Sequence, residues 1–131
     1  MIFLDTSGIY ALTDDTDTMH AEALRMYELA VERGEGIIIH SYVLVESAAL
    51  IQNRIGSRVS LAFLKDAEMF TVIWVDRVLH DSAVCYLRTQ GSSALSLVDA
   101  VSFQVMTDMG ITKYLGFDKH FSDAGFSPYS V

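Results

Sequence analysis

Four acidic residues, far apart in the sequence, stand where carboxylates could do chemistry together. They are Asp5, Glu46, Asp99 and Asp118. Asp5 directly follows the apolar run 2–4. Carboxylates that converge raise one another's pKa and oppose folding unless a partner neutralises them. A divalent cation with a preference for oxygen ligands, such as Mg²⁺ or Mn²⁺, is a suitable partner, so the pattern indicates a metal centre.

The chemistry open to such a centre is hydrolysis of a phosphodiester. A bound cation screens the repulsion between the acids and the phosphate, lowers the pKa of a bound water and stabilises charge on the phosphoryl and leaving oxygens. The net charge of −8 is unlike the basic surplus of a general nucleic-acid binder. The acids are therefore either dispersed over the surface or gathered where a cation neutralises them, and only their positions can decide.

The elements that position these acids alternate between strands and helices. We expect strands at 2–4, 37–39, 70–75, 114–117 and 129–131, and helices from about 18 to 33, 41–55, 57–69, 76–90 and 97–109. Asp17, Ser57 and Asp76 are expected N-caps, and Gly56, Gly91 and Gly110 are expected helix ends. Strands separated by helices imply an α/β fold with a parallel sheet and helices on both faces.

Topology then brings the four acids to one edge of the sheet. Asp5 and Asp118 follow the first and fourth strands, and ligand sites of parallel sheets lie at the carboxyl ends of strands. Glu46 falls in the first turns of the helix after the second strand. Asp99 falls in the first turn of the helix that precedes the fourth strand, and that helix must begin at the same edge.

Each acid also has a purely structural interpretation. Asp5 can cap a helix that begins at Thr6, and Asp118 can cap a last helical turn. The segment from Ser96 to Asp99 matches a capping box. Glu46 stands among apolar neighbours, where an unpartnered acid is unfavourable. Taken singly none of these acids identifies a site, whereas four on one edge favour a functional cluster.

The length and composition fit one domain over residues 1–131, since 51% of the residues are hydrophobic. No run approaches the roughly 20 apolar residues of a membrane span. No basic leader precedes the first apolar run. Cys85 is the single cysteine, so no intramolecular disulfide can form. We therefore expect a protein of the reducing cytoplasm, without membrane attachment.

Four segments together carry a family likeness. They are Ile2 to Ser7 (IFLDTS), Val43 to Glu46 (VLVE), Ser96 to Phe103 (SLVDAVSF) and Phe117 to Phe121 (FDKHF). In order and spacing the chain resembles the PIN-domain nucleases, and within them the VapC type, the toxin half of prokaryotic toxin–antitoxin pairs. The likeness spans nearly the whole chain.

The resemblance implies a three-layer α/β/α sandwich with a mostly parallel central sheet, and cleavage of RNA by an endonuclease that depends on Mg²⁺ or Mn²⁺. It matches Asp5, Glu46, Asp99 and Asp118 to the family's acidic quartet, and Thr6 or Ser7 to a small polar residue that supports the metal site. It also implies a homodimer and capture by a cognate antitoxin. Gly116 departs from the family, which often has Thr or Ser there, so a supporting hydroxyl is in doubt.

Basic residues are few, so those that face RNA should be identifiable. Arg54 and Arg58 flank Gly56, and Lys119 and His120 follow Asp118. We expect these four to be the candidates for phosphate contacts, with a solvated surface position as the alternative.

Two other functions stay open. A magnesium-dependent phosphatase-like domain would favour a second acid two residues after Asp5, where this chain has Ser7. A PIN-like module that binds RNA or protein without catalysis would have no need for four costly acids.

Overall fold

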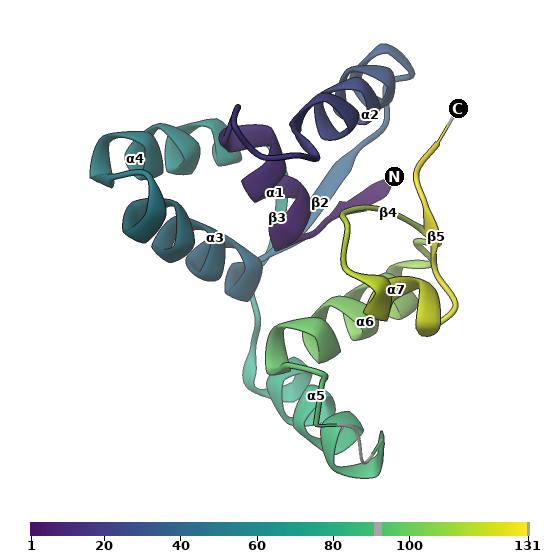
Figure 1. Ribbon diagram of the computed structural model, residues 1–131. Helices are drawn as coiled ribbons and strands as arrows, with labels where there is room; N and C mark the ends of the chain where they lie inside the picture. Colours follow the sequence, from purple (N-terminus) through teal and green to yellow (C-terminus); the bar gives the residue numbers. More distant parts are fainter. Residues whose placement is uncertain (91–92, 131) are drawn as a thin grey trace.

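The computed structural model describes residues 1–90 and 93–130 (Figure 1). The described residues form one parallel sheet of five strands in the order β3-β2-β1-β4-β5. The strands are β1 (Ile2–Leu4), β2 (Ile37–His40), β3 (Thr71–Ile73), β4 (Lys113–Leu115) and β5 (Ser127–Pro128). β1 pairs with both β2 and β4, so the strand order reverses beside β1. The fold class is α/β, as expected.

The helices connect these strands. They are α1 (Thr6–Thr13), α2 (His20–Glu32), α3 (Ser41–Arg54), α4 (Ser57–Asp66), the 3₁₀ turn η1 (Ala67–Met69), α5 (Arg77–Gln90), α6 (Leu97–Met109) and α7 (Lys119–Asp123). Figure 1 shows α1 and α2 on one side of the sheet and α5 and α6, packed on each other, on the other side. The three layers bury all three residues of β1, as a strand covered on both faces requires.

Two buried contacts fix the parts that matter for the site. Gly8 lets α1 approach β4 closely, because a Cβ there would lie 2.5 Å from the carbonyl oxygen of Leu115. Phe121 of α7 is fully buried, and its ring centroid lies 4.8 Å from that of Tyr114, 5.1 Å from that of Phe103 and 6.1 Å from that of Phe3. β1, β4, α6 and α7 therefore share one aromatic core.

Helix boundaries differ from expectation in several places. α2 begins at His20, and Asp17 accepts the Met19 N–H at 2.8 Å in the turn before it. Gly56 rather than Ser57 is the N-cap residue of α4, and Ser57 is the first residue of that helix. Asp76 accepts the Leu79 N–H at 2.8 Å and caps α5 as predicted. The predicted end at Gly91 lies outside the described residues.

The strands are shorter than expected or shifted. β3 covers only 71–73 of the predicted 70–75. β4 ends at Leu115, because the Phe117 N–H donates to the Ser7 hydroxyl instead of continuing the strand. The last strand is 127–128, aligned on β4 by hydrogen bonds from Ser127 and Tyr129. Val131 of the predicted 129–131 lies outside the described residues.

α1 and α7 were expected only as alternatives, through possible caps at Asp5 and Asp118, and both caps are confirmed. In the described part of the chain, no helix has both the length and the apolar character needed to cross a membrane.

Candidate active site

Asp5 joins the end of β1 to the start of α1. It is the N-cap of α1, and its Oδ2 accepts the Ser7 hydroxyl at 2.9 Å and the Ser7 N–H at 3.4 Å. Its backbone N–H donates to the carbonyl oxygen of Leu115, which ties it to β4. Only 4% of Asp5 is exposed, and this burial raises its pKa to about 6, with the charge of Asp99 adding to the effect. Asp5 is thus a carboxylate whose ionised form needs a neutralising partner.

Ser7 takes the place that a side chain at position 116 would occupy. A Cβ on Gly116 would lie 3.0 Å from both the Asp5 Cβ and the Ser7 Oγ. Ser7 Oγ donates to Asp5 and accepts the Phe117 N–H at 2.8 Å, so one hydroxyl connects the ends of β1 and β4. The hydroxyl that the family resemblance placed in doubt at 116 is therefore supplied from α1. The neighbouring Thr6 hydroxyl is buried and forms no hydrogen bond in the described part of the chain.

Asp99 begins α6 inside a capping box. Ser96 Oγ accepts the Asp99 N–H at 3.1 Å, and the Asp99 Oδ2 accepts the Ser96 N–H at 3.2 Å. Asp99 is buried, and this burial, together with the charge of Asp118, raises its pKa. The predicted capping box is confirmed, and it lies at the carboxyl edge of the sheet, where the functional interpretation also requires Asp99.

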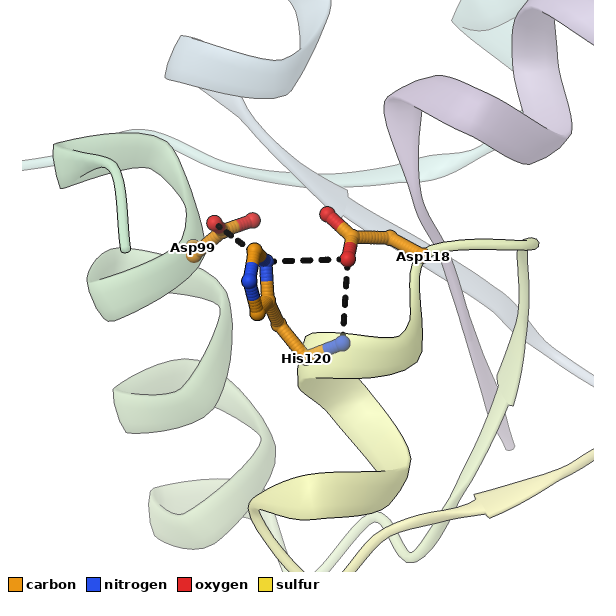
Figure 2. Close-up of side chains that lie close together, drawn as sticks. All are labelled: Asp99, Asp118 and His120. Carbon is orange, nitrogen blue, oxygen red and sulfur yellow. Dashed lines mark hydrogen bonds and ion pairs between the residues drawn. The ribbon is translucent and has the colours of Figure 1, made fainter. Parts of the chain in front are cut away.

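Asp118 and His120 face Asp99 from the start of α7 (Figure 2). Asp118 is the N-cap of α7, and its Oδ1 accepts the His120 N–H at 3.0 Å. The His120 Nδ1 lies 2.9 Å from the Asp118 Oδ1 and 3.6 Å from the Asp99 Oδ2. This nitrogen is buried and not aligned for a hydrogen bond with either carboxylate. A cation placed between these three side chains would offset the repulsion between the two carboxylates.

Glu46 approaches the same space from α3. It is exposed, and it lines a cleft of about 550 Å³ together with Asp5, Asp99 and Asp118. The tight group of potential ligand atoms, all within 4.8 Å of one another, comprises Asp99, Asp118 and His120 among the described residues. Asp5 and Glu46 lie in the wall of the cleft outside this group. The structure thus places all four predicted acids around one cleft.

The donor set fits a divalent cation. The Asp99 and Asp118 carboxylates and the His120 imidazole nitrogen meet at one point, and Asp5, a second buried acid with a raised pKa, lies in the wall of the same cleft. Within residues 1–90 and 93–130, no lysine or arginine forms an ion pair with any of the four acids. Oxygen donors of this kind, accompanied by water, suit hard divalent ions.

The basic residues expected to face RNA fall in different places. Arg54 lines the cleft, with its guanidinium over the Tyr10 ring. Arg58 is exposed on α4 and does not line the cleft, and the exposed Lys119 lines a neighbouring hollow beside α2. His120 lies among the carboxylates instead of on the rim.

Tyr10 lines the cleft and was missed by sequence reasoning. The sequence does indicate this position, because Thr6 and Tyr10 are four residues apart and share one face of a helix capped by Asp5.

Comparisons with known proteins agree with this geometry. The family model of the PIN domain matches residues 2–127. The chain is 34% identical over 129 residues to the 23S rRNA-specific endonuclease VapC20 of Mycobacterium tuberculosis, from strains CDC 1551 and H37Rv, with 96% of this chain and 95% of the relative covered.

Among solved structures, the chain is similar to the crystal structure of M. tuberculosis VapC20, described as a sarcin–ricin loop cleaving toxin. The TM-score is 0.87 at 31% identity, and 97% of each chain is covered. The likeness therefore extends over nearly the whole chain.

Proposed function

The chain belongs to the PIN-domain family, and from that premise we propose that it is a metal-dependent endoribonuclease, the VapC-type toxin of a toxin–antitoxin pair. Residues 1–131 form its single nuclease domain. The observation that carries the proposal is the convergence of Asp5, Glu46, Asp99 and Asp118 on one cleft, with Asp99, Asp118 and His120 within 4.8 Å of one another.

The residues of the cleft have distinct tasks. Asp99 and Asp118 would hold a Mg²⁺ or Mn²⁺ ion, and Asp5 and Glu46 would contribute to its binding from the cleft wall. When bound, the ion activates water and stabilises negative charge on the phosphodiester. Ser7 keeps the Asp5 carboxylate oriented, and the buried Thr6 lines the same cleft.

The substrate is RNA with an accessible loop. A loop offers a phosphodiester without a paired strand, and the cleft at the sheet edge is open to solvent. The sarcin–ricin loop of 23S rRNA, named for the M. tuberculosis relative, is the first RNA to test.

The partners follow from the same family. The protein works in the cytoplasm as a homodimer and is silenced by a cognate antitoxin protein. Exposed apolar side chains offer surface for such contacts: Val45, Leu61, Met69, Trp74 and Val78. Sedimentation velocity of the purified chain tests the dimer, and co-expression with the product of a neighbouring small gene tests the antitoxin.

The rival functions lack specific support. Ser7 is bonded to Asp5 and to the backbone of β4's end, so it does not supply the second acid of a phosphatase of the D-x-D type. A silent binding module would not require two buried acids with raised pKa values in one cleft.

The deciding experiment measures RNA cleavage by purified variants. Wild type, Asp5→Asn, Asp118→Asn and Asp108→Asn are incubated with a sarcin–ricin stem–loop RNA and Mg²⁺ or Mn²⁺. Asp108 is an exposed acid of α6 outside the cleft, so Asp108→Asn matches the change of charge. We expect cleavage by wild type and Asp108→Asn, and loss of about 100-fold or more in the other two.

Addition of EDTA should abolish cleavage, and metal should restore it. Cleavage that survives in Asp5→Asn and Asp118→Asn would come from another site or another protein and would refute the proposed function. RNA binding without turnover would favour the silent module.

A further inference from the structure

One face of α3 runs along the cleft from its acidic centre outwards. Glu46, Leu50 and Arg54 are spaced four residues apart, and all three line the cleft. Two turns of helix, a rise of about 12 Å, separate Arg54 from Glu46. The Arg54 guanidinium therefore lies on the cleft wall, beyond the point where Asp99 and Asp118 meet.

Tyr10 holds this positive group in place. The Arg54 Cζ lies 5.1 Å from the centroid of the Tyr10 ring, within range of a cation–π contact. The Tyr10 hydroxyl donates to the Asp14 Oδ2 at 2.7 Å. The Asp14 Oδ1 accepts the Thr16 N–H at 3.0 Å and the Thr16 hydroxyl at 2.7 Å. The loop after α1 thus fixes the ring, and the ring presents the guanidinium to the cleft.

The charge of Arg54 is not neutralised inside the protein. In the described part of the chain Arg54 forms no ion pair with a carboxylate, although the net charge of the protein is −8. Of the residues that line the cleft, Arg54 is the one arginine or lysine within the described ranges. A guanidinium matches phosphate oxygens with two parallel N–H donors.

We propose that Arg54, seated on Tyr10, forms a subsite for an RNA backbone phosphate next to the one that is cleaved. This inference rests on the proposed function and adds to it a positioning device. The Arg54 subsite counters the repulsion between RNA and the acidic cleft, and it sets how far the chain of the substrate extends past Glu46. Tyr10 acts through Arg54 and does not itself touch the reacting phosphate.

The test measures binding of a fluorescent sarcin–ricin stem–loop RNA to full-length protein. The variants are made on the Asp5→Asn background with Mg²⁺ present, so that the RNA stays intact. Arg54→Gln should weaken binding about tenfold, and Arg54→Lys should weaken it less. Loss of one phosphate contact should also reduce the slope of log affinity against log salt by about 0.7.

The Tyr10 variants test whether the ring positions Arg54 without contributing a charge of its own. Tyr10→Leu should weaken binding about threefold with an unchanged salt slope, and Tyr10→Phe, which keeps the ring but loses the hydrogen bond to Asp14, should weaken it less. Arg58→Gln is the matched control, since Arg58 is exposed outside the cleft, and it should bind like the parent. With Asp5 intact, Arg54→Gln should raise KM and leave kcat nearly unchanged.

The outcomes distinguish the two proposals. If wild type cleaves RNA but Arg54→Gln matches its parent in affinity and salt slope, the subsite is refuted and the nuclease stands. If Arg54→Gln impairs only antitoxin binding, Arg54 serves an acidic protein partner and the subsite is refuted as well. If wild type neither binds nor cleaves RNA, the proposed function itself fails.

Discussion

Asp5, Asp99 and Asp118 each accept a backbone N–H at the start of a helix and also face the cleft. A helix that follows or precedes a parallel strand begins at the carboxyl edge of the sheet, so a residue at its start already lies where ligands bind. The positive end of the helix also favours a carboxylate there. At the scale of the residue, capping and metal binding are compatible tasks for the same side chains.

The charge state of Asp5 should set a pH dependence of stability in the metal-free protein. The folded protein keeps the Asp5 proton up to about pH 6, whereas the unfolded chain releases it near pH 3.8. Between these values the folded state binds more protons, so the free energy of unfolding decreases as pH rises. Asp5→Asn should therefore be more stable than wild type at pH 7, by up to about 3 kcal/mol, and equal to it below about pH 4.

Urea denaturation in EDTA at both pH values measures this difference. Asp108→Asn is the control and should show no such gap. If Asp5→Asn is less stable than wild type at pH 7, the ionised Asp5 carboxylate does not destabilise the folded protein.

Gly116 should tolerate no side chain while Ser7 is present. A Cβ at 116 would press on Asp5 and Ser7 at 3.0 Å, so we expect Gly116→Ala to cost about 1–3 kcal/mol and at least tenfold in cleavage rate. Gly36→Ala is the matched control, because its Cβ would meet only the Met1 side chain at 3.5 Å.

A double substitution adds a sharper test at this position. In the Ser7→Ala background, Gly116→Ser should be less harmful than Gly116→Ala is in wild type, because the hydroxyl returns from the other side. If these two substitutions at position 116 reduce the cleavage rate equally, Ser7 and residue 116 do not share one space.

At the scale of the element, Phe121 connects α7 to the rest of the core. We expect Phe121→Ala to cost about 3–5 kcal/mol and to release α7, and with it Asp118 and His120. Phe63→Ala on α4 is the control, since Phe63 is buried away from the cleft. Circular dichroism and cleavage assays, both below the melting temperature, should show low activity for folded Phe121→Ala and near-normal activity for folded Phe63→Ala.

His40 joins α3, which carries Glu46, to α6, which carries Asp99. Its Nδ1 accepts the Tyr42 and Val43 N–H groups at the start of α3, and its Nε2 donates to the Ser102 hydroxyl at 2.8 Å. The Ser102 hydroxyl in turn donates to the carbonyl oxygen of Val98. These partners require the neutral imidazole, and burial lowers the pKa of His40 to about 4.

The protonation of His40 changes the stability with pH in the opposite direction to that of Asp5. Between pH 6.5 and about pH 4 the unfolded chain binds a proton at this histidine and the folded state does not, so this contribution to stability is lost as pH falls. His40→Asn keeps the cap but not the Ser102 contact. We expect it to cost about 1–3 kcal/mol at pH 7 and less at pH 4.5. A constant difference across this range would contradict a neutral His40.

The regular helices and buried strands could be predicted because their apolar spacing and caps are local. α1 was expected only as an alternative, through the Asp5 cap, because its residues are apolar on most sides and include Gly8, a pattern that only close packing on β4 explains. α7 has five residues and depends on Phe121 contacts from distant segments. The convergence of the four acids could be predicted from strand ends and helix starts, whereas the position of His120 could not, because it depends on how α7 packs against α6.

At the scale of the whole molecule, bound metal should stabilise the fold. We expect Mn²⁺ at about 100 times its Kd to add about 2.7 kcal/mol and to raise Tm by roughly 10 °C for a domain of this size. Asp118→Asn should lose most of that rise, and Asp108→Asn should keep it. Differential scanning calorimetry with and without EDTA measures the shift. An equal rise in both variants would place the ion elsewhere.

The pairing of β1 with β4 joins Phe3 to Tyr114 and Leu4 to Leu115. Such distant pairing forms late, because the intervening chain must first be closed into a loop. During translation, Asp5 emerges from the ribosome long before Asp118, and the two cannot meet until β4 is free to enter the sheet. A growing chain therefore cannot complete its cleft before β4 and Asp118 have been made, and a premature stop before Lys113 should yield a product without nuclease activity.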